Sequence, residues 1–233
     1  MNRGKFRSLA ALALLAIGFL VPAAAQQAAR PVYFANTIQQ FLEQDKSNPP
    51  PQGAILFIGS SIFVQWADLE VQMAPLPVFN RAFGGSRTWE VLHYADKIVL
   101  PYKPRIIVYY CGSNDVDTGV GAAETAANFK AFVNKVAAQL PETRIFYVSI
   151  SKAPEKKALW NVVDEANSRI RDYTTHSKQL GYIDVNPALF DAAGNPRLEL
   201  YHEDELHFRP PAYVEFTKII RPVIERTWAG ARR

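Results

Sequence analysis

The chain has 233 residues, of which 48% are hydrophobic and 21% charged, so it is long enough to form a domain with a substantial core. Its 26 Lys and Arg residues against 22 Asp and Glu residues give a net charge of +4, too small to indicate a nucleic acid or an anionic surface as partner. Cys111 is the only cysteine, which excludes an internal disulfide.

Residues 1–25 have the pattern of a secretory signal peptide. Three basic residues lie within the first seven, an apolar stretch follows over 9–20, and three alanines ending at Ala25 offer a cleavage site. Because the stretch is too short to span a bilayer as an ordinary helix, we expect cleavage after Ala25, with an uncleaved anchor as the alternative. The mature chain would be exported from a bacterial cytoplasm to the periplasm or the medium, without a stable membrane anchor. Its 23 basic and 22 acidic residues would give a net charge of +1.

Apolar runs alternate with amphipathic stripes along the mature chain, which favours strands alternating with helices. Such alternation implies parallel strands joined by right-handed crossovers, and therefore a single three-layer α/β domain over 26–233. Ser86 or Thr88 is the expected N-cap of the third helix. In chain order, the patterns predict a helix over 33–46, a buried strand over 54–58, a short helix over 62–69, a strand over 77–80, a helix over 88–94, a buried strand over 105–111, a helix over 122–140, a strand over 144–150, a long helix over 156–180 ending at Gly181, a short strand over 182–185 and a helix over 211–228.

The strand over 54–58 leads directly into Gly59, Ser60 and Ser61. Open α/β sheets bind their ligands at the carboxyl ends of the strands, and a glycine there lets the chain turn sharply. A serine at the start of a helix is more often an N-cap than a nucleophile. The catalytic interpretation therefore depends on partners elsewhere in the chain.

Ester hydrolysis by a serine needs a base, a group that orients the base, and donors for the oxyanion. Of the four histidines, His93 and His176 fall within predicted helices and are readily explained as helix-face residues. His202 and His207 lie in a polar, acidic segment, where Asp204 precedes His207 by three residues and could orient its imidazole. A solvated acidic loop and a metal site are the alternatives, but the spacing of these histidines is not that of a zinc-protease helix.

Two further segments should lie beside Ser61 if the strands pair in parallel. Residues 80–85 read Asn-Arg-Ala-Phe-Gly-Gly, residues 112–115 read Gly-Ser-Asn-Asp, and each segment follows a predicted strand as a loop. A glycine N–H and an asparagine amide are donors of the kind that an oxyanion hole uses. Either segment alone would more often be a plain turn.

Together these segments resemble the four motif blocks of the SGNH (GDSL-type) hydrolases, in the same order. Residues 59–62, Gly-Ser-Ser-Ile, stand where the family has Gly-Asp-Ser-Leu, and residues 80–85 match the second block. Residues 112–115 match the third block, Gly-x-Asn-Asp, and residues 204–207 match the last, Asp-x-x-His. The resemblance covers about 54–208, most of the mature chain. It implies a three-layer α/β/α sandwich whose sheet is mostly five-stranded, parallel and in flavodoxin-like order.

The resemblance also implies roles for individual residues. Ser61 would be the nucleophile, His207 the base and Asp204 the residue that orients the base. The oxyanion hole would consist of the Ser61 N–H, the Gly85 N–H and the Asn114 side chain.

Two departures from the family pattern leave alternatives open. Ser60 replaces the aspartate of the first block, as in a Gly-Ser-Ser branch of the family, and is therefore a competing nucleophile. Gly84 and Gly85 are adjacent in the second block, and the spacing from Asn80 favours Gly85 as the donor.

The function expected from these residues is that of an exported serine esterase working through an acyl-enzyme, without metal or cofactor. Short connections around the site leave little sequence for a lid, which favours acetyl or short-chain esters of a small molecule or a glycan. Lysophospholipase, thioesterase and acyltransferase activities on the same triad are alternatives. A non-catalytic glycan-binding module is a further alternative. Loss of a triad residue would have favoured it, but all three residues are present. Phe63, Trp66 and Phe208 are expected in the core rather than in a pocket, and no pattern specifies an oligomeric state.

Overall fold

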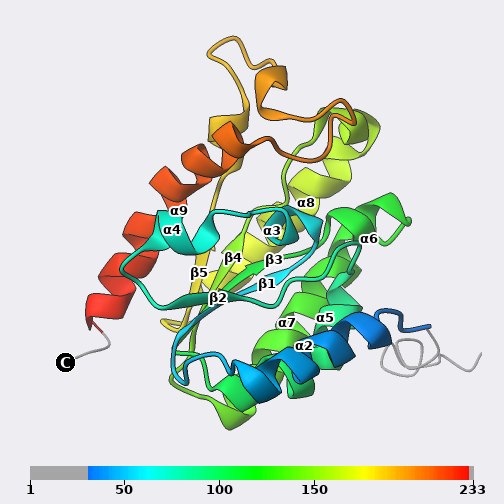
Figure 1. Ribbon diagram of the computed structural model, residues 1–233. Coiled ribbons are helices and arrows are strands. Elements are labelled where there is room, and N and C mark those ends of the chain that lie inside the picture. The colour runs from blue at the N-terminus through cyan, green and yellow to red at the C-terminus, as the bar shows by residue number, and fades with distance from the viewer. Residues whose placement is uncertain (1–30, 231–233) are drawn as a thin grey trace, which may run out of the picture. The chain divides into compact units, whose positions relative to one another are not determined.

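The computed structural model describes residues 31–230 (Figure 1). A compact unit that begins at Val32 contains almost all of these residues. The leader predicted over 1–25 lies outside them, so its cleavage and the export of the protein stay predictions. Among residues 31–230, no helix combines the length and the apolar character needed to cross a membrane.

A five-stranded parallel sheet forms the centre of the fold (Figure 1). Its order is β2-β1-β3-β4-β5, which confirms the predicted flavodoxin-like arrangement. Every residue of β1 and β3 is buried, as expected for central strands covered on both faces. The strands are β1 (Ile55–Gly59), β2 (Val78–Asn80), β3 (Ile106–Tyr110), β4 (Arg144–Val148) and β5 (Leu180–Ile183).

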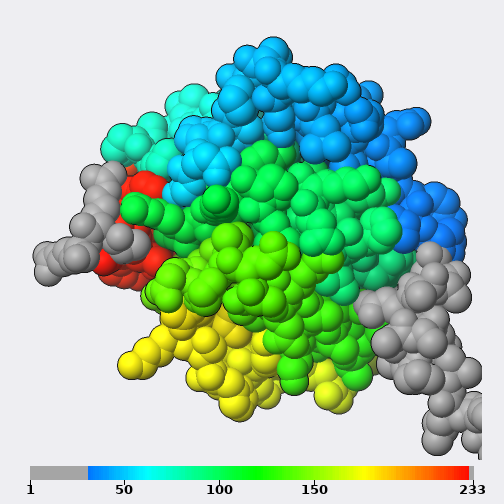
Figure 2. Space-filling model, turned by 90° about the horizontal axis from the view of Figure 1, so that it is seen from below, coloured from blue at the N-terminus to red at the C-terminus, as the bar shows by residue number. Residues whose placement is uncertain are grey.

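Helices cover both faces of this sheet, and alternate residues of each strand pack against opposite layers. On one face, Ile58 and Tyr109 join a core cluster with α2, α5, α7 and α8, whereas Phe57 and Tyr110 join α3, α4 and α9 on the other. On the face shown in Figure 2, green segments lie between blue and yellow ones. The helices are α2 (Ala35–Ser47), α3 (Ser61–Val64), α4 (Leu69–Met73), α5 (Thr88–Ile98), α6 (Ser113–Asp117), α7 (Ala122–Gln139), α8 (Trp160–Thr174) and α9 (Pro210–Gly230), with 3-10 turns at Leu100–Tyr102, Pro154–Leu159, Asn186–Leu189 and Leu198–Leu200.

Several predicted elements have other boundaries in the structure. The short helix expected over 62–69 is two helices, α3 and α4, because its apolar spacing reflects burial in one core cluster rather than a continuous helix. The long helix expected over 156–180 begins as a 3-10 turn and ends at Thr174. Gly181 does not end this helix but lies in β5, where a Cβ would come within 2.5 Å of the Phe146 ring. That glycine is needed for close packing within the sheet.

Two further differences lie near the carboxyl edge of the sheet. Residues 113–117 form the short helix α6, where a loop was expected. The N-cap of α5 is Arg87, not Ser86 or Thr88. The Glu90 carboxylate accepts a hydrogen bond from the Arg87 N–H (3.0 Å) and so satisfies an amide at the helix start.

Candidate active site

Ser61 is the first residue of α3 and is separated from the end of β1 by Ser60 alone, at the carboxyl edge of the sheet. Gly59 makes this turn possible: its φ is 142°, and a Cβ there would lie 1.7 Å from the Tyr110 carbonyl oxygen. Ser60 is buried, with 1% of its surface exposed, and its N–H donates to the Tyr110 carbonyl (3.0 Å). Ser61 is only partly buried. The two neighbouring serines therefore differ in access to the surface.

The side chains of Ser61, His207 and Asp204 form one hydrogen-bonded chain. His207 Nε2 lies 3.0 Å from Ser61 Oγ, and His207 Nδ1 lies 2.6 Å from Asp204 Oδ2. The Asp204 Oδ1 atom also accepts hydrogen bonds from the N–H groups of Leu206 (3.0 Å) and His207 (2.9 Å). The turn is closed by the His202 N–H, which donates to the His207 carbonyl (2.9 Å). A serine and a histidine 146 positions apart are thus brought within hydrogen-bond distance.

The charge of Asp204 is fixed by these contacts. Burial alone would raise the pKa of Asp204, but the hydrogen bonds from the His207 side chain and from the N–H groups of His207 and Leu206 outweigh it and lower the pKa to about 2. The carboxylate is therefore ionised at neutral pH. A carboxylate beside Nδ1 holds the imidazole proton there, so that the Nε2 lone pair faces the Ser61 hydroxyl.

The other three histidines make different contacts. His93 is exposed on α5 and packs edge-on against the Tyr94 ring, and the Nδ1 of His176 lies 2.9 Å from the Asp172 carbonyl oxygen. His202 is exposed in the same loop as His207. Across residues 31–230, no group of three or more His, Cys, Asp or Glu side chains has the arrangement needed to hold a metal ion.

The predicted oxyanion donors follow β1, β2 and β3. The Ser61 N–H begins α3, so it has no acceptor within the helix. Among the described residues, the N–H groups of Gly84 and Gly85 donate no backbone hydrogen bond either, and a Cβ on Gly84 would lie 3.9 Å from that of Ser61. Asn114, in α6, donates one amide N–H to the Ser86 carbonyl (3.0 Å). This contact orients the amide and leaves its second N–H available.

A cavity of about 710 Å³ adjoins this site on the side of His207 and Asp204. Ser61 is not among the residues that line it. Phe63 is fully buried, as expected of a core residue, whereas Trp66 and Phe208 are buried and also form part of the cavity wall. The polar side chains of the wall come from the α3–α4 connection, α4 and the His207 loop: Gln65, Asp68, Gln72, His202 and Glu203.

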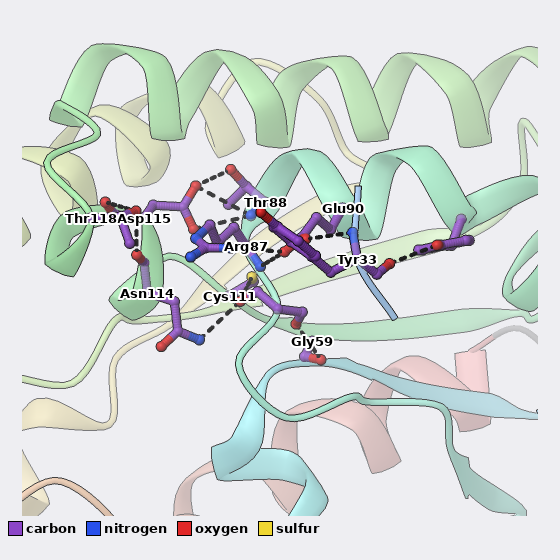
Figure 3. A network of polar contacts seen from close by, with 11 residues as sticks. Tyr33, Gly59, Arg87, Thr88, Glu90, Cys111, Asn114, Asp115 and Thr118 are labelled. Atoms are coloured by element: carbon purple, nitrogen blue, oxygen red, sulfur yellow. Dashed lines mark hydrogen bonds and ion pairs between the residues drawn. The ribbon is translucent and has the colours of Figure 1, made fainter. Parts of the chain in front are cut away.

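Sequence reasoning missed the residues that join the second and third donor segments. Figure 3 shows Thr88 and Asp115 pointing toward each other, with Asn114 and Cys111 nearby. The one available signal was the final aspartate of the Gly-x-Asn-Asp block, because Thr88 was expected only as a possible helix N-cap. A hydrogen bond between α5 and α6 depends on how the two elements pack, which sequence spacing does not specify.

Comparison with known proteins places the chain in a family. Residues 57–214 match the GDSL-like Lipase/Acylhydrolase family. A candidate platelet activating factor from Streptococcus pneumonia has a similar structure (TM-score 0.70, 24% identity, covering 78% of this chain and 89% of that one). A GDSL-like lipase from Bacteroides thetaiotaomicron gives a TM-score of 0.70 at 17% identity, covering 84% of this chain and 100% of that one.

A more distant solved structure is a carbohydrate esterase family 3 protein from Talaromyces cellulolyticus, with a TM-score of 0.59 at 15% identity and coverage of 74% of this chain and 96% of that one. No curated protein matches the sequence. The family match nevertheless spans more than half of the chain and contains Ser61, Gly85, Asn114, Asp204 and His207. The chain therefore belongs to the GDSL-like lipase/acylhydrolase family and is a carboxylic ester hydrolase.

Proposed function

We propose that the mature protein is an exported serine esterase that removes acetyl or other short acyl groups from small-molecule or carbohydrate esters. The observation that carries this proposal is the hydrogen-bonded chain from Asp204 through His207 to Ser61. It provides a nucleophile, a base and a carboxylate in the order that acyl transfer requires.

In the proposed mechanism, Ser61 Oγ attacks the ester carbonyl while His207 Nε2 takes its proton. Negative charge then develops on the carbonyl oxygen, and the N–H groups of Ser61 and Gly85 and the Asn114 amide stabilise it. Collapse of the intermediate releases the alcohol, which receives the proton from His207. Water then attacks the acyl-enzyme with His207 again as the base, which releases the acid and restores Ser61.

Two observations support a substrate with a small acyl group and a hydroxylated alcohol. The cavity beside His207 has several polar side chains in its wall, which suit the hydroxyl groups of a sugar. Proteins of similar fold include an acetyl esterase, solved with an acetate ion, and the carbohydrate esterase described above. The scheme uses no metal or cofactor.

Acyl-chain preference tests the substrate class. Across aryl esters from acetyl to decanoyl, we expect kcat/KM to be highest for acetyl or propionyl and to fall by about tenfold or more for octanoyl, because each unaccommodated methylene group weakens binding of the transition state. Initial rates on the purified mature protein measure this. A rise in kcat/KM towards long chains would favour a lysophospholipase, and a preference for thioesters would favour a thioesterase. Acyl transfer to an added sugar in preference to water would favour an acyltransferase.

Asn114→Ala tests the oxyanion hole. Loss of one such donor should lower kcat by about 10²- to 10³-fold with little change in KM, because the amide is worth more to the transition state than to the bound ester. Asn114→Asp should be at least as damaging, since it replaces a donor with a negative charge. Steady-state kinetics and a melting curve on the same preparation give the result. A lower Tm with an unchanged kcat for the folded fraction would mean that Asn114 only holds α6 in place.

A further inference from the structure

Two adjacent residues of α6 hold the segment that follows β2 (Figure 3). The Asn114 amide donates to the Ser86 carbonyl at 3.0 Å. The Thr88 N–H lies 3.0 and 3.2 Å from the two carboxylate oxygens of Asp115, and the Thr88 hydroxyl donates to the same carboxylate. The segment that carries Gly84 and Gly85 is therefore tied to α6 at two points, immediately after the glycines.

Further hydrogen bonds hold α6 and the segment after β2 in place. The Asn128 amide of α7 donates to Thr88 Oγ1 (3.0 Å), which directs the hydroxyl proton toward Asp115. Ser86 Oγ donates to the Gly59 carbonyl (3.0 Å) at the end of β1, and the Cys111 thiol lies 3.3 Å from the Ser86 carbonyl oxygen. The ends of β1, β2 and β3, which carry the three proposed donors, are thus joined by one polar network.

Ionisation of the buried Asp115 carboxyl group lowers the stability of the fold at neutral pH. Asp115 and Thr88 are fully buried. Burial raises the pKa of Asp115 to about 6, although the hydrogen bonds from Thr88 and the charge of Arg87 oppose the change. A carboxyl group whose pKa is raised on folding stabilises the fold at low pH, and this contribution is lost as the pH rises toward the raised value. At neutral pH, Asp115 is therefore better explained by what it positions than by the stability that it adds.

We propose that Asp115 and Thr88 are positioning residues that fix the distance between the Asn114 amide and the N–H groups of Gly84 and Gly85. Donors of an oxyanion hole act because they are held in place before charge develops, so a small displacement weakens stabilisation of the transition state. Neither residue is assigned a contact with the substrate. The inference rests on the proposed oxyanion role of these donors.

Thr88→Val tests this role, because valine keeps the shape of threonine but removes the hydroxyl. We expect kcat for an aryl acetate to fall by about 10- to 100-fold with KM nearly unchanged, and the rate of phosphonate labelling of Ser61 to fall in parallel. Thr88→Ser retains the hydroxyl and should recover most of the loss. Thr143→Val is the matched control, since Thr143 is also buried and its hydroxyl donates to the Pro104 carbonyl (2.7 Å) before the start of β4, at the opposite edge of the sheet. It should keep kcat within about twofold even where its Tm falls as much as that of Thr88→Val.

Asp115→Asn provides the same test should Thr88→Val fail to fold. Asparagine has the shape of aspartate and carries no charge, so its Tm at neutral pH should equal or exceed that of the wild type. Its amide oxygen can accept from the Thr88 hydroxyl, but its NH₂ group then replaces the carboxylate oxygen that lies 3.0 Å from the Thr88 N–H, so two donors face each other and kcat should fall by about tenfold. A wild-type kcat in folded Thr88→Val or in Asp115→Asn overturns the proposal.

Asn114→Ala separates failure of this inference from failure of the proposed function. If Asn114→Ala keeps its kcat, the oxyanion hole itself is wrong, and so is the positioning role that depends on it. If Asn114→Ala loses kcat but Thr88→Val does not, only the positioning role is wrong. If both roles are correct, adding Thr88→Val to Asn114→Ala should lower kcat by a smaller factor than Thr88→Val does alone, because one of the positioned donors is already absent. A full multiplicative loss would show that Thr88 acts independently of Asn114 and would also overturn the proposal.

Discussion

Ser61→Ala is expected to lower kcat for an aryl acetate by about 10⁵- to 10⁶-fold, while the protein keeps its fold and its KM. The substitution removes the hydroxyl that His207 Nε2 contacts at 3.0 Å, and no acyl-enzyme can form without it. Ser61 is partly exposed and its side chain has no other hydrogen bond among the described residues, so little stability is lost. Steady-state kinetics with a chromogenic acetate ester measure the change in kcat.

Ser60→Ala is the matched control for this result. Ser60 is the same residue type one position earlier, but it is buried. We expect Ser60→Ala to stay within about tenfold of the wild-type kcat, as for a residue outside the reacting groups. Loss of activity in Ser60→Ala together with activity in Ser61→Ala would reverse the assignment.

His207→Ala should have an effect of similar size, about 10⁶-fold in kcat, because the serine then has no base to take its proton. The double variant Ser61→Ala, His207→Ala should be no worse than either single one, since the two residues act as a unit. Asp204 should remain ionised well below neutral pH, because its pKa is lowered to about 2, so its protonation should not limit kcat/KM near neutral pH.

Two controls distinguish a base from a metal ligand. His202 lies in the same loop and lines the cavity without contacting Ser61, so any effect of His202→Ala should be confined to KM. Chelators should leave the activity unchanged. Strong inhibition by EDTA that zinc reverses, together with loss of kcat in His202→Ala, would favour a metal site instead.

The sheet was predictable because its strands carry strong local signals. Residues 54–58 and 106–111 are apolar without interruption, and the strands that form there, β1 and β3, are buried at every residue. The family resemblance supplied the strand order. The candidate site residues could be proposed for a related reason: Gly59, Asn114 and Asp204 each occur in a short motif at the carboxyl end of a strand or before the last helix.

Other features depend on packing that a sequence pattern does not specify. Gly181 resembles a helix terminator, but it lies in β5 because the Phe146 ring leaves no room for a Cβ. Asn114 was expected in a loop, but it lies in the short helix α6. The Lys156 ammonium contacts both ends of this helix: it donates to the Ser113 carbonyl (3.3 Å) and lies 3.4 Å from an Asp117 carboxylate oxygen. The contact of Thr88 with Asp115 joins residues 27 positions apart. Such contacts follow from the assembled fold and cannot be read from spacing.

The most direct test of the account is the site of covalent modification. The mature protein is incubated with an alkyl phosphonate that reacts as a transition-state mimic, digested, and mapped by peptide mass spectrometry. The account predicts one label, on Ser61, which is absent from Ser61→Ala and forms more slowly in His207→Ala and Asn114→Ala. A label on Ser60, with Ser61→Ala still labelled and active, would contradict it.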